Sequence, residues 1–187
     1  FHGLRSDKPA ADIVVETPKH VATMNLTNPD RVIDAESGIT KLDLARYYDT
    51  VAPLMMEHLK GRPVALVRAP DGVAGEKFFQ KHLDKTEMQG VRLLDPALDE
   101  GHAPLIEVAS PQGLRSASQM NVVEYHTWNA RKDRIERPDR ITFDLDPGEG
   151  VAWERVQEAA QLVHTLLGEL GLPAFLKTSG GKGLHVV

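Results

Sequence analysis

The sequence predicts an α+β fold in which helices pack against a split βαβ sheet. Two observations carry this prediction. Short apolar runs typical of strands recur between longer segments whose apolar residues have helical spacing. Residues 141–187 read as strand, helix, strand, tight glycine turn and strand, which is the first half of a split βαβ arrangement. With 187 residues, the chain is long enough for one sizeable core.

Residues 11–121 are predicted to form an N-terminal α/β part, preceded by a polar linker at residues 1–10. Apolar runs predict four strands in this part, at residues 13–15, 21–26, 64–67 and 105–108. The Pro-Asp-Gly sequence at residues 70–72 indicates a turn after the third of these strands. Residues 75–101 show no clear periodicity and are left unassigned.

Two helices are predicted in the same part, at residues 40–60 and 110–121. Thr40 has the position of a helix N-cap, and Asp43 lies in the first turn that follows. Pro53 is expected to kink or split the first helix, because proline lacks the backbone donor and clashes with the preceding turn. Gly61 is expected to end that helix.

Residues 122–187 are predicted to start a second part. Its expected strands lie at residues 122–127, 141–145 and 174–178, and its helix, with a regular apolar stripe, at residues 151–170. Gly171 and Pro173 stop this helix. The loop at residues 131–140 is highly charged and basic on balance.

The composition excludes several function classes. The chain has no cysteine, which removes disulfides, thiolate catalysis and cysteine-based zinc sites. No apolar run approaches the length of a membrane span, so we expect a cytosolic protein with no membrane partner. A formal net charge of −5 does not indicate a nucleic-acid binder, although phosphate contacts need only a local basic patch. Because the chain starts at Phe1 and ends in a strand-like run at Val187, we interpret it as a fragment truncated within its core.

Asp144 and Asp146 are the first candidate site residues. They lie two positions apart at the end of a predicted strand, so alternation puts both carboxylates on one face of the sheet. Two anions so close, with no basic residue between them, repel each other unless a cation lies there. Carboxylate oxygens suit Mg²⁺ or Mn²⁺, and these ions commonly act on phosphates. The pair therefore predicts a divalent metal site.

A glycine-rich turn at residues 179–183 is the second candidate. Its glycines leave backbone N–H groups unobstructed, Ser179 offers a hydroxyl group and Lys182 supplies positive charge. By itself, such a turn is also typical of a plain hairpin with a surface lysine. Together with the carboxylate pair it indicates nucleotidyl or phosphoryl transfer.

The topology brings the two candidates together. In a split βαβ sheet the returning strand lies antiparallel beside the first strand, which places His185 next to Asp144 and Asp146. Alternation then directs His185 to the same face as the two carboxylates and leaves Leu184 and Val186 for the core.

The motifs taken in order resemble one family. They read TNPDRVID, GITKLDLARYY, GRPVALVRAPDG, FFQKH, VEYHTWNA, FDLDPGEG and KTSGGKGLHVV. This set resembles the polymerase-domain family of bacterial DNA ligase D, within the archaeo-eukaryotic primase superfamily. The resemblance implies a primase-like catalytic core with an RRM-like sheet and an N-terminal β/α subregion. It also implies a bacterial end-joining repair polymerase that adds nucleotides, preferably ribonucleotides, to 3′ ends at gaps and breaks.

The resemblance assigns roles to the catalytic candidates. Asp144 and Asp146 match the aspartates that bind two divalent ions, Mn²⁺ or Mg²⁺ with Mn²⁺ favoured, and His126 matches a histidine near the nucleotide and metals. The residues matching the nucleotide-binding motif are Ser179, Gly180, Gly181, Lys182 and His185. Without the resemblance, a buried structural role for His126 is an equally good interpretation.

The resemblance also assigns DNA contacts. Arg31 and Lys41 match positions that bind the 5′-phosphate at a DNA end or gap, although each residue alone is typical of solvated surface charge. Phe78 and Phe79 match an aromatic pair at the end of the duplex, where an exposed ring can stack on a base. We expect one of the two rings to lie in the core and the other to contact DNA.

The family completes its metal site with a third aspartate in a later strand, and this chain stops at Val187. The fragment alone is therefore expected to lack full activity. The implied partners are 5′-phosphorylated DNA ends, NTP or dNTP, Ku, and covalently linked ligase and phosphoesterase domains, in the bacterial cytoplasm at the nucleoid. Two alternatives stay open, a non-catalytic module that binds DNA ends and nucleotides, and an aspartate-nucleophile phosphatase, which has no place for the glycine-rich turn.

Overall fold

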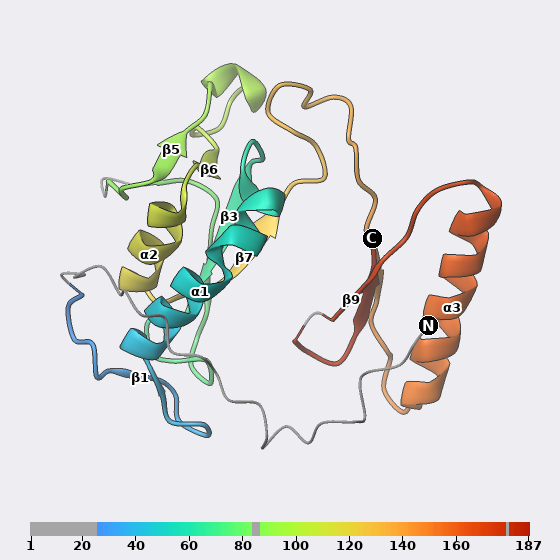
Figure 1. The fold of residues 1–187 in the computed structure, drawn as a ribbon, viewed down its shortest axis with the longest axis horizontal. Coiled ribbons are helices and arrows are strands. Elements are labelled where there is room, and N and C mark those ends of the chain that lie inside the picture. Colours follow the sequence, from blue (N-terminus) through green and yellow to red (C-terminus); the bar gives the residue numbers. More distant parts are fainter. Residues whose placement is uncertain (1–25, 84–86, 179) are drawn as a thin grey trace.

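The computed structural model describes residues 26–83, 87–178 and 180–187, which form two lobes (Figure 1). The linker predicted at residues 1–10 and the strands predicted before residue 26 lie outside the described residues. The first lobe contains β1 (Val32–Asp34), β2 (Ile39–Thr40), α1 (Lys41–Leu59), β3 (Val64–Arg68), β4 (Phe78–Gln80), β5 (Val91–Leu93), the 3₁₀ helix η2 (Pro96–Leu98), β6 (Ile106–Val108), α2 (Pro111–Gln119) and β7 (Val122–Thr127). The second lobe contains β8 (Phe143–Leu145), α3 (Trp153–Glu169), β9 (Leu176–Thr178) and β10 (Leu184–Val186).

Each lobe has its own antiparallel sheet, and the first lobe also contains a separate two-stranded antiparallel sheet of β1 and β2. In the first lobe the strand order is β4-β3-β6-β5, and β7 also pairs with β3. In the second lobe the order is β8-β10-β9, so the last strand lies between the other two. Residues 122–127 were predicted to belong to the second part, whereas β7 is hydrogen-bonded to β3 of the first lobe. Val122, at the start of β7, is fully buried in the first core. The chain therefore leaves the first lobe only after Thr127, where β7 ends.

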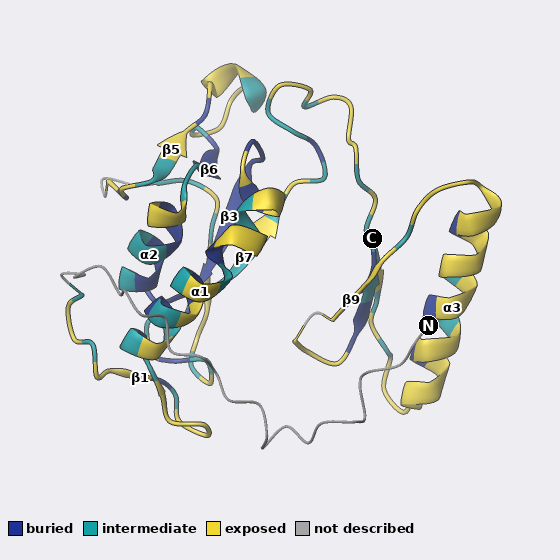
Figure 2. Ribbon diagram, viewed as in Figure 1, coloured by how far each residue is buried: buried dark blue, intermediate teal, exposed yellow. Residues whose placement is uncertain are grey.

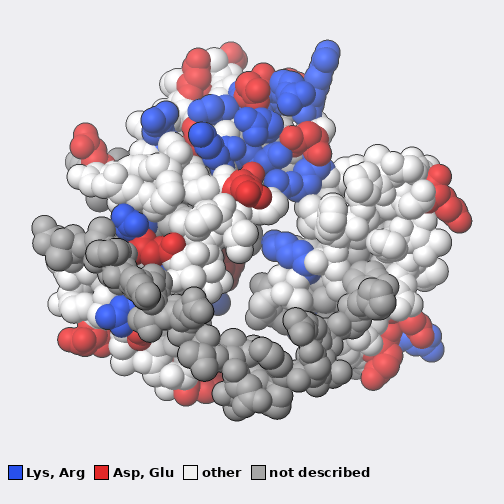
Figure 3. Space-filling model, viewed as in Figure 1, with Lys and Arg blue, Asp and Glu red and all other residues white. Residues whose placement is uncertain are grey.

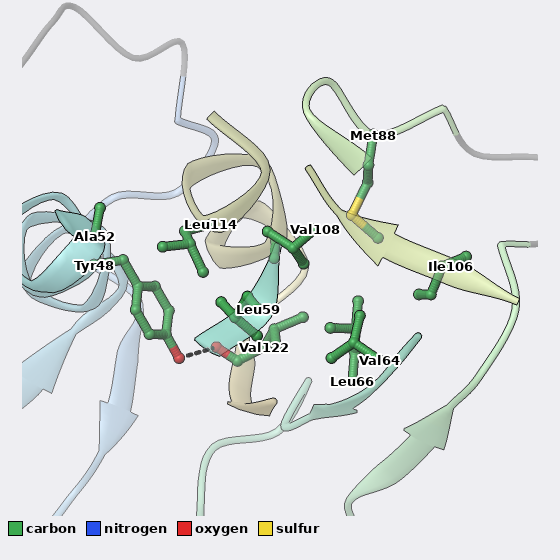
Figure 4. Close-up of a cluster of buried hydrophobic side chains, with 11 residues drawn as sticks. Tyr48, Ala52, Leu59, Val64, Leu66, Met88, Ile106, Val108, Leu114 and Val122 are labelled. Carbon is green, nitrogen blue, oxygen red and sulfur yellow. Dashed lines mark hydrogen bonds between the residues drawn. The ribbon is translucent and has the colours of Figure 1, made fainter. Parts of the chain in front are cut away.

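Helix α1 shows how local sequence positions the first core. Thr40 and Asp43 form a reciprocal capping box, in which each side chain accepts a hydrogen bond from the backbone N–H of the other residue. The helix is not split at Pro53, contrary to one expectation, because Ala52 before the proline and Leu59 after it are both buried in the core. The Tyr48 hydroxyl donates to the Val122 carbonyl oxygen at 2.8 Å, which ties α1 to β7 (Figure 4).

The second lobe is built from α3 and its three-stranded sheet. Buried residues of α3 lie on the side that faces the strands, and the outer side of the helix is exposed (Figure 2). The small core formed there consists of Val156, Ala160, Leu167, Leu184 and Val186. Because α3 covers one face of the sheet, the opposite face is available for a site. In the part of the chain that the structure describes, no helix is both long and apolar enough to cross a membrane.

The connection between β7 and β8 is fastened to the first lobe by ion pairs. Arg62, whose side chain is 8% exposed, makes two hydrogen bonds of 2.7 and 2.9 Å to the Asp139 carboxylate. Lys132 donates to the Glu107 carboxylate, which also accepts the backbone N–H of Gly61. Figure 3 shows Lys and Arg side chains gathered at the top of the view, where this connection lies in Figure 1.

We predict that Asp139→Asn destabilises the protein at neutral pH, because the substitution leaves the buried charge of Arg62 without its partner. The Arg62 guanidinium beside Asp139 holds the pKa of that carboxyl below its ordinary value of 3.8. A lowered pKa stabilises the fold above the unfolded-state pKa, and this contribution is lost as the pH falls through the folded-state pKa. Urea unfolding should therefore show a difference at pH 7 that shrinks below pH 3.8.

The control for this experiment is Asp133→Asn. Asp133 pairs with Arg131 on the same connection, but its side chain is 61% exposed. Exposed pairs contribute little, about 0–1 kcal/mol, so this variant should unfold nearly like the wild type at both pH values. If the two variants behaved alike, Asp139 would have no special role in holding the connection.

Candidate active site

Asp144 and His185 face each other across the sheet of the second lobe. They are directly opposed in the antiparallel pair of β8 and β10, so their side chains lie on the same face. The His185 Nε2 atom lies 3.2 Å from the Asp144 Oδ1 atom. Leu184 and Val186 are buried on the opposite face against α3. The predicted register and face of His185 are therefore confirmed.

Asp146 lies one residue beyond β8, beside Gly183. A Cβ atom added to Gly183 would lie 2.3 Å from the Asp146 Oδ1 atom and 2.9 Å from the Leu145 carbonyl oxygen. Only a residue without a side chain allows this approach. Continuing the β8–β10 register by one residue places Asp146 opposite Gly183, on the face that carries Asp144.

The donor set on this face fits a hard divalent cation. Asp144, 61% exposed in its side chain, pairs with His185, and the structure shows no Lys or Arg ion pair for either aspartate among the described residues. Mg²⁺ is commonly held by one or two carboxylates, with water and substrate phosphates completing its shell. The described residues contain no cluster of three or more acidic or histidine groups suited to a metal. Asp144 and Asp146 alone could supply only part of a coordination shell.

The glycine-rich turn leads directly into β10. Gly180 has φ of +82°, a conformation that favours glycine, and it is exposed, as are Gly181 and Lys182. Ser179 lies outside the described residues. The turn therefore presents Lys182 at the same end of the sheet as Gly183, beside Asp146.

His126 lies on β7 and is half-exposed, which rules out the alternative of a buried structural histidine. Its Nε2 atom lies 2.7 Å from the Glu124 Oε2 atom, and Lys77 approaches the other Glu124 oxygen at 3.9 Å. Within the described residues His126 has no hydrogen bond or ion pair with Asp144 or Asp146. Sequence reasoning missed Glu124, although residues two apart on a strand share a face.

Phe78 and Phe79 are both exposed, by 49% and 57%. The expectation that one ring belongs to the core is wrong. As successive residues of β4, the two rings point to opposite faces of the strand, and both faces are open to solvent there. Phe79 makes an edge contact with the His126 ring at 5.4 Å between centroids, and the Lys81 ammonium lies 5.9 Å from the Phe79 centroid.

Arg31 and Lys41 lie together at the start of α1, where the Lys41 N–H donates to the Arg31 carbonyl at 2.8 Å. Lys41 is only 5% exposed, and its Nζ atom donates to the Thr27 carbonyl oxygen at 3.0 Å. Burial lowers the pKa of Lys41, and the nearby charge of Arg31 lowers it further. Arg31 is more open and contacts the Pro70 carbonyl and the Asp71 carboxylate.

With this geometry established, comparison with known proteins identifies the family. The family described as the primase-polymerase domain of LigD matches residues 40–187 of this chain. The chain belongs to the LigD primase-polymerase family. The solved polymerase domain of Mycobacterium tuberculosis ligase D, in complex with DNA, has a TM-score of 0.77 and 34% identity, over 88% of this chain and 60% of that one.

Full-length LigD proteins show the same relationship. The multifunctional non-homologous end joining protein LigD of Pseudomonas aeruginosa is 46% identical over 100% of this chain and 24% of its own length. The protein of the same name from Mycolicibacterium smegmatis is 36% identical over 87% of this chain and 22% of its own length. The chain therefore spans about a quarter of these LigD relatives. The predicted family and the α+β fold of antiparallel sheets and helices are confirmed, and the phosphatase alternative gains no support from these matches.

Proposed function

We propose that this chain is the polymerase part of a DNA end-joining enzyme, which adds nucleotides to 3′ ends at gaps and breaks. One observation carries the proposal: Asp144, Asp146 and His185 share the face of the second sheet that α3 leaves uncovered. The LigD relatives, named for non-homologous end joining, support the same reaction. A preference for ribonucleotides and for Mn²⁺ over Mg²⁺ is part of the proposal.

Asp144 and Asp146 hold the metal ions in this proposal. When bound there, two Mg²⁺ or Mn²⁺ ions would supply positive charge to stabilise the charge that develops on the reacting phosphate. His185 donates to Asp144, which fixes the direction of its ring toward the bound nucleotide. Lys182 and the exposed turn residues Gly180 and Gly181 bind the triphosphate in this proposal. His126, which contacts Glu124 on the first lobe, is proposed to act on the same nucleotide.

Arg31 and Lys41 form the proposed site for the 5′-phosphate of the downstream strand. Two neighbouring cations repel each other, and a bound dianion between them relieves that repulsion. Their position at the N-terminus of α1 adds the favourable end of the helix dipole. Exposed Phe78 and Phe79, with Lys81 beside the second ring, suit stacking on bases where the duplex ends.

The test uses the full-length protein and a gapped duplex with a 5′-phosphate on the downstream strand. In the presence of Mn²⁺, the protein should extend the 3′ end with the templated nucleotide, and faster with NTP than with dNTP. Binding of the gap without any extension would instead support the non-catalytic alternative. Ku, the ligase and phosphoesterase domains, and a location at the bacterial nucleoid are proposed partners and setting, by analogy with the end-joining relatives.

Lys41→Met is predicted to weaken binding to a gap that carries a 5′-phosphate and to leave binding to a 5′-hydroxyl gap nearly unchanged. Hydrogen bonds to charged groups contribute about 1.5–3 kcal/mol, which corresponds to a loss of at least about tenfold in affinity. Fluorescence anisotropy with the two gapped duplexes measures the difference. Because Lys41 is buried, thermal unfolding must be measured in parallel.

The matched control is Lys60→Met, which removes an exposed lysine at the other end of α1. This variant should bind both gaps like the wild type. An equal loss on both duplexes for Lys41→Met would show that Lys41 contributes only general electrostatics or stability.

A further inference from the structure

Three side chains form a row across the exposed face of the second sheet. Asp144 on β8 is opposed to His185 on β10, and His185 is opposed in turn to Lys177 on β9. Directly opposed residues of antiparallel strands point to the same face. Neighbouring strands lie about 4.8 Å apart, so Lys177 stands one strand beyond His185 and two strands beyond the carboxylate. The row therefore has the negative charge of Asp144 at one end and the positive charge of Lys177 at the other.

Lys177 is also available for a ligand. It is exposed, and its side chain makes no hydrogen bond or ion pair in the part of the chain that the structure describes. Asp144, two strands away, is already paired with His185. The exposed ammonium of Lys177 thus has no acidic partner among the described residues.

Positive charge is scarce in this lobe. Residues 143–187 contain only Arg155, Lys177 and Lys182 as Arg or Lys. Arg155 lies on α3, which covers the other face of the sheet, and it is paired with Glu158 at 2.7 Å. The face that carries the aspartates therefore has two cations to offer an anionic ligand, Lys182 from the turn and Lys177 from β9.

We propose that Lys177 is a further nucleotide-binding residue, which contacts the triphosphate of the incoming nucleotide from the side opposite to Asp144. This inference rests on the proposed function, because it places the triphosphate over His185. A phosphate bound there has the carboxylates and their metals on one side and Lys177 on the other. Lys182 then acts from the end of the sheet, so the two lysines approach the triphosphate from different directions.

The experiment compares Lys177→Met and Lys177→Arg in the full-length protein, with Lys60→Met as the control. Loss of a charge-assisted contact should raise the KM for the nucleotide by about tenfold or more in Lys177→Met, with little change in kcat or in the affinity for DNA. Lys177→Arg keeps the charge and should recover most of the affinity. Lys60→Met should match the wild type.

A second measurement separates this inference from the proposed function. Equilibrium binding of ATP with Mg²⁺, and of adenosine as a ligand without phosphates, needs no DNA and no catalysis. Lys177→Met should weaken ATP binding about tenfold or more relative to the wild type and leave adenosine binding unchanged. Suppose that the wild-type protein binds ATP in a Lys177-dependent way and yet extends no primer. That result would refute the polymerase proposal and leave the inference about Lys177 standing.

Three results would overturn the inference. In the first, Lys177→Met leaves both the KM for the nucleotide and the affinity for ATP unchanged. In the second, the wild-type protein does not bind ATP. The third is a variant whose DNA affinity falls while its ATP affinity holds, which would make Lys177 a contact to the nucleic-acid backbone. In each of the first and third cases, extension by the wild type would leave the polymerase proposal intact.

Discussion

Asp144→Asn and Asp146→Asn should each abolish nucleotide addition by the full-length protein. A catalytic metal contributes several kcal/mol of transition-state stabilisation, and each 1.4 kcal/mol is tenfold in rate, so the loss should be at least about 100-fold. Asparagine keeps the size of the side chain and an oxygen acceptor for His185. The substitution therefore removes the charge proposed to hold the metal and should leave the sheet intact. Primer extension in Mn²⁺ measures the rate.

Glu149→Gln is the matched control for these two variants. Glu149 is an exposed acid in the loop that follows Asp146, outside the row on the sheet. It should extend primers at the wild-type rate, and all three variants should bind gapped DNA like the wild type. Normal extension by either aspartate variant would remove the metal hypothesis, whereas lost DNA binding would point to misfolding.

The face that carries Asp144, Asp146 and His185 was predictable because two local features, a short turn and strand alternation, constrain the last strand. The turn at residues 179–183 is too short to send the chain anywhere but back along β9. Alternation then fixes the face of His185, and buried Leu184 and Val186 lock the register, since a slip of one residue would expose both. The start of α1 was predictable for the same reason, because a capping box is contained within four residues.

The residues that were misjudged depend on contacts between distant segments. Phe78 and Phe79 are both exposed because no other segment packs over either face of β4 at these rings, which an apolar pair in the sequence cannot reveal. Lys41 can be buried because its ammonium donates a hydrogen bond to the carbonyl oxygen of Thr27, which lies before β1 in the chain. A lysine at the start of a helix is otherwise typical of solvated charge.

The pairing of β7 with β3 is a third example. The two strands are separated in sequence by more than fifty residues, and the pairing places His126 beside Phe79 on the first lobe. Apolar periodicity predicts that a strand exists at residues 122–127, but it carries no information about which sheet the strand joins. The individual candidate residues of the first lobe could therefore be predicted from the sequence, but their arrangement relative to one another could not.

Gly183→Ala should be nearly as damaging to nucleotide addition as loss of Asp146 itself. The new Cβ atom would lie 2.3 Å from the Asp146 Oδ1 atom and 2.9 Å from the Leu145 carbonyl oxygen, so the carboxylate or the strand must shift. Misplacement of a catalytic group by about 1 Å can lower the rate by about 100-fold. We therefore expect primer extension to fall by about that factor, and higher Mn²⁺ concentrations to restore part of it.

Gly168→Ala is the matched control, because it makes the same chemical change in the same lobe. Gly168 lies in α3, and a Cβ atom there meets nothing within 4 Å. Gly168 is in the last turn of α3, where alanine is tolerated at least as well as glycine, so this variant should unfold at or slightly above the wild-type temperature and extend primers normally. If Gly183→Ala instead lowered the stability of the lobe and left Mn²⁺ dependence unchanged, Gly183 would serve the packing of β10 against β8. A loss of activity with a near-normal unfolding temperature and a raised Mn²⁺ requirement would tie Gly183 to the position of the Asp146 carboxylate, and hence to the metal site.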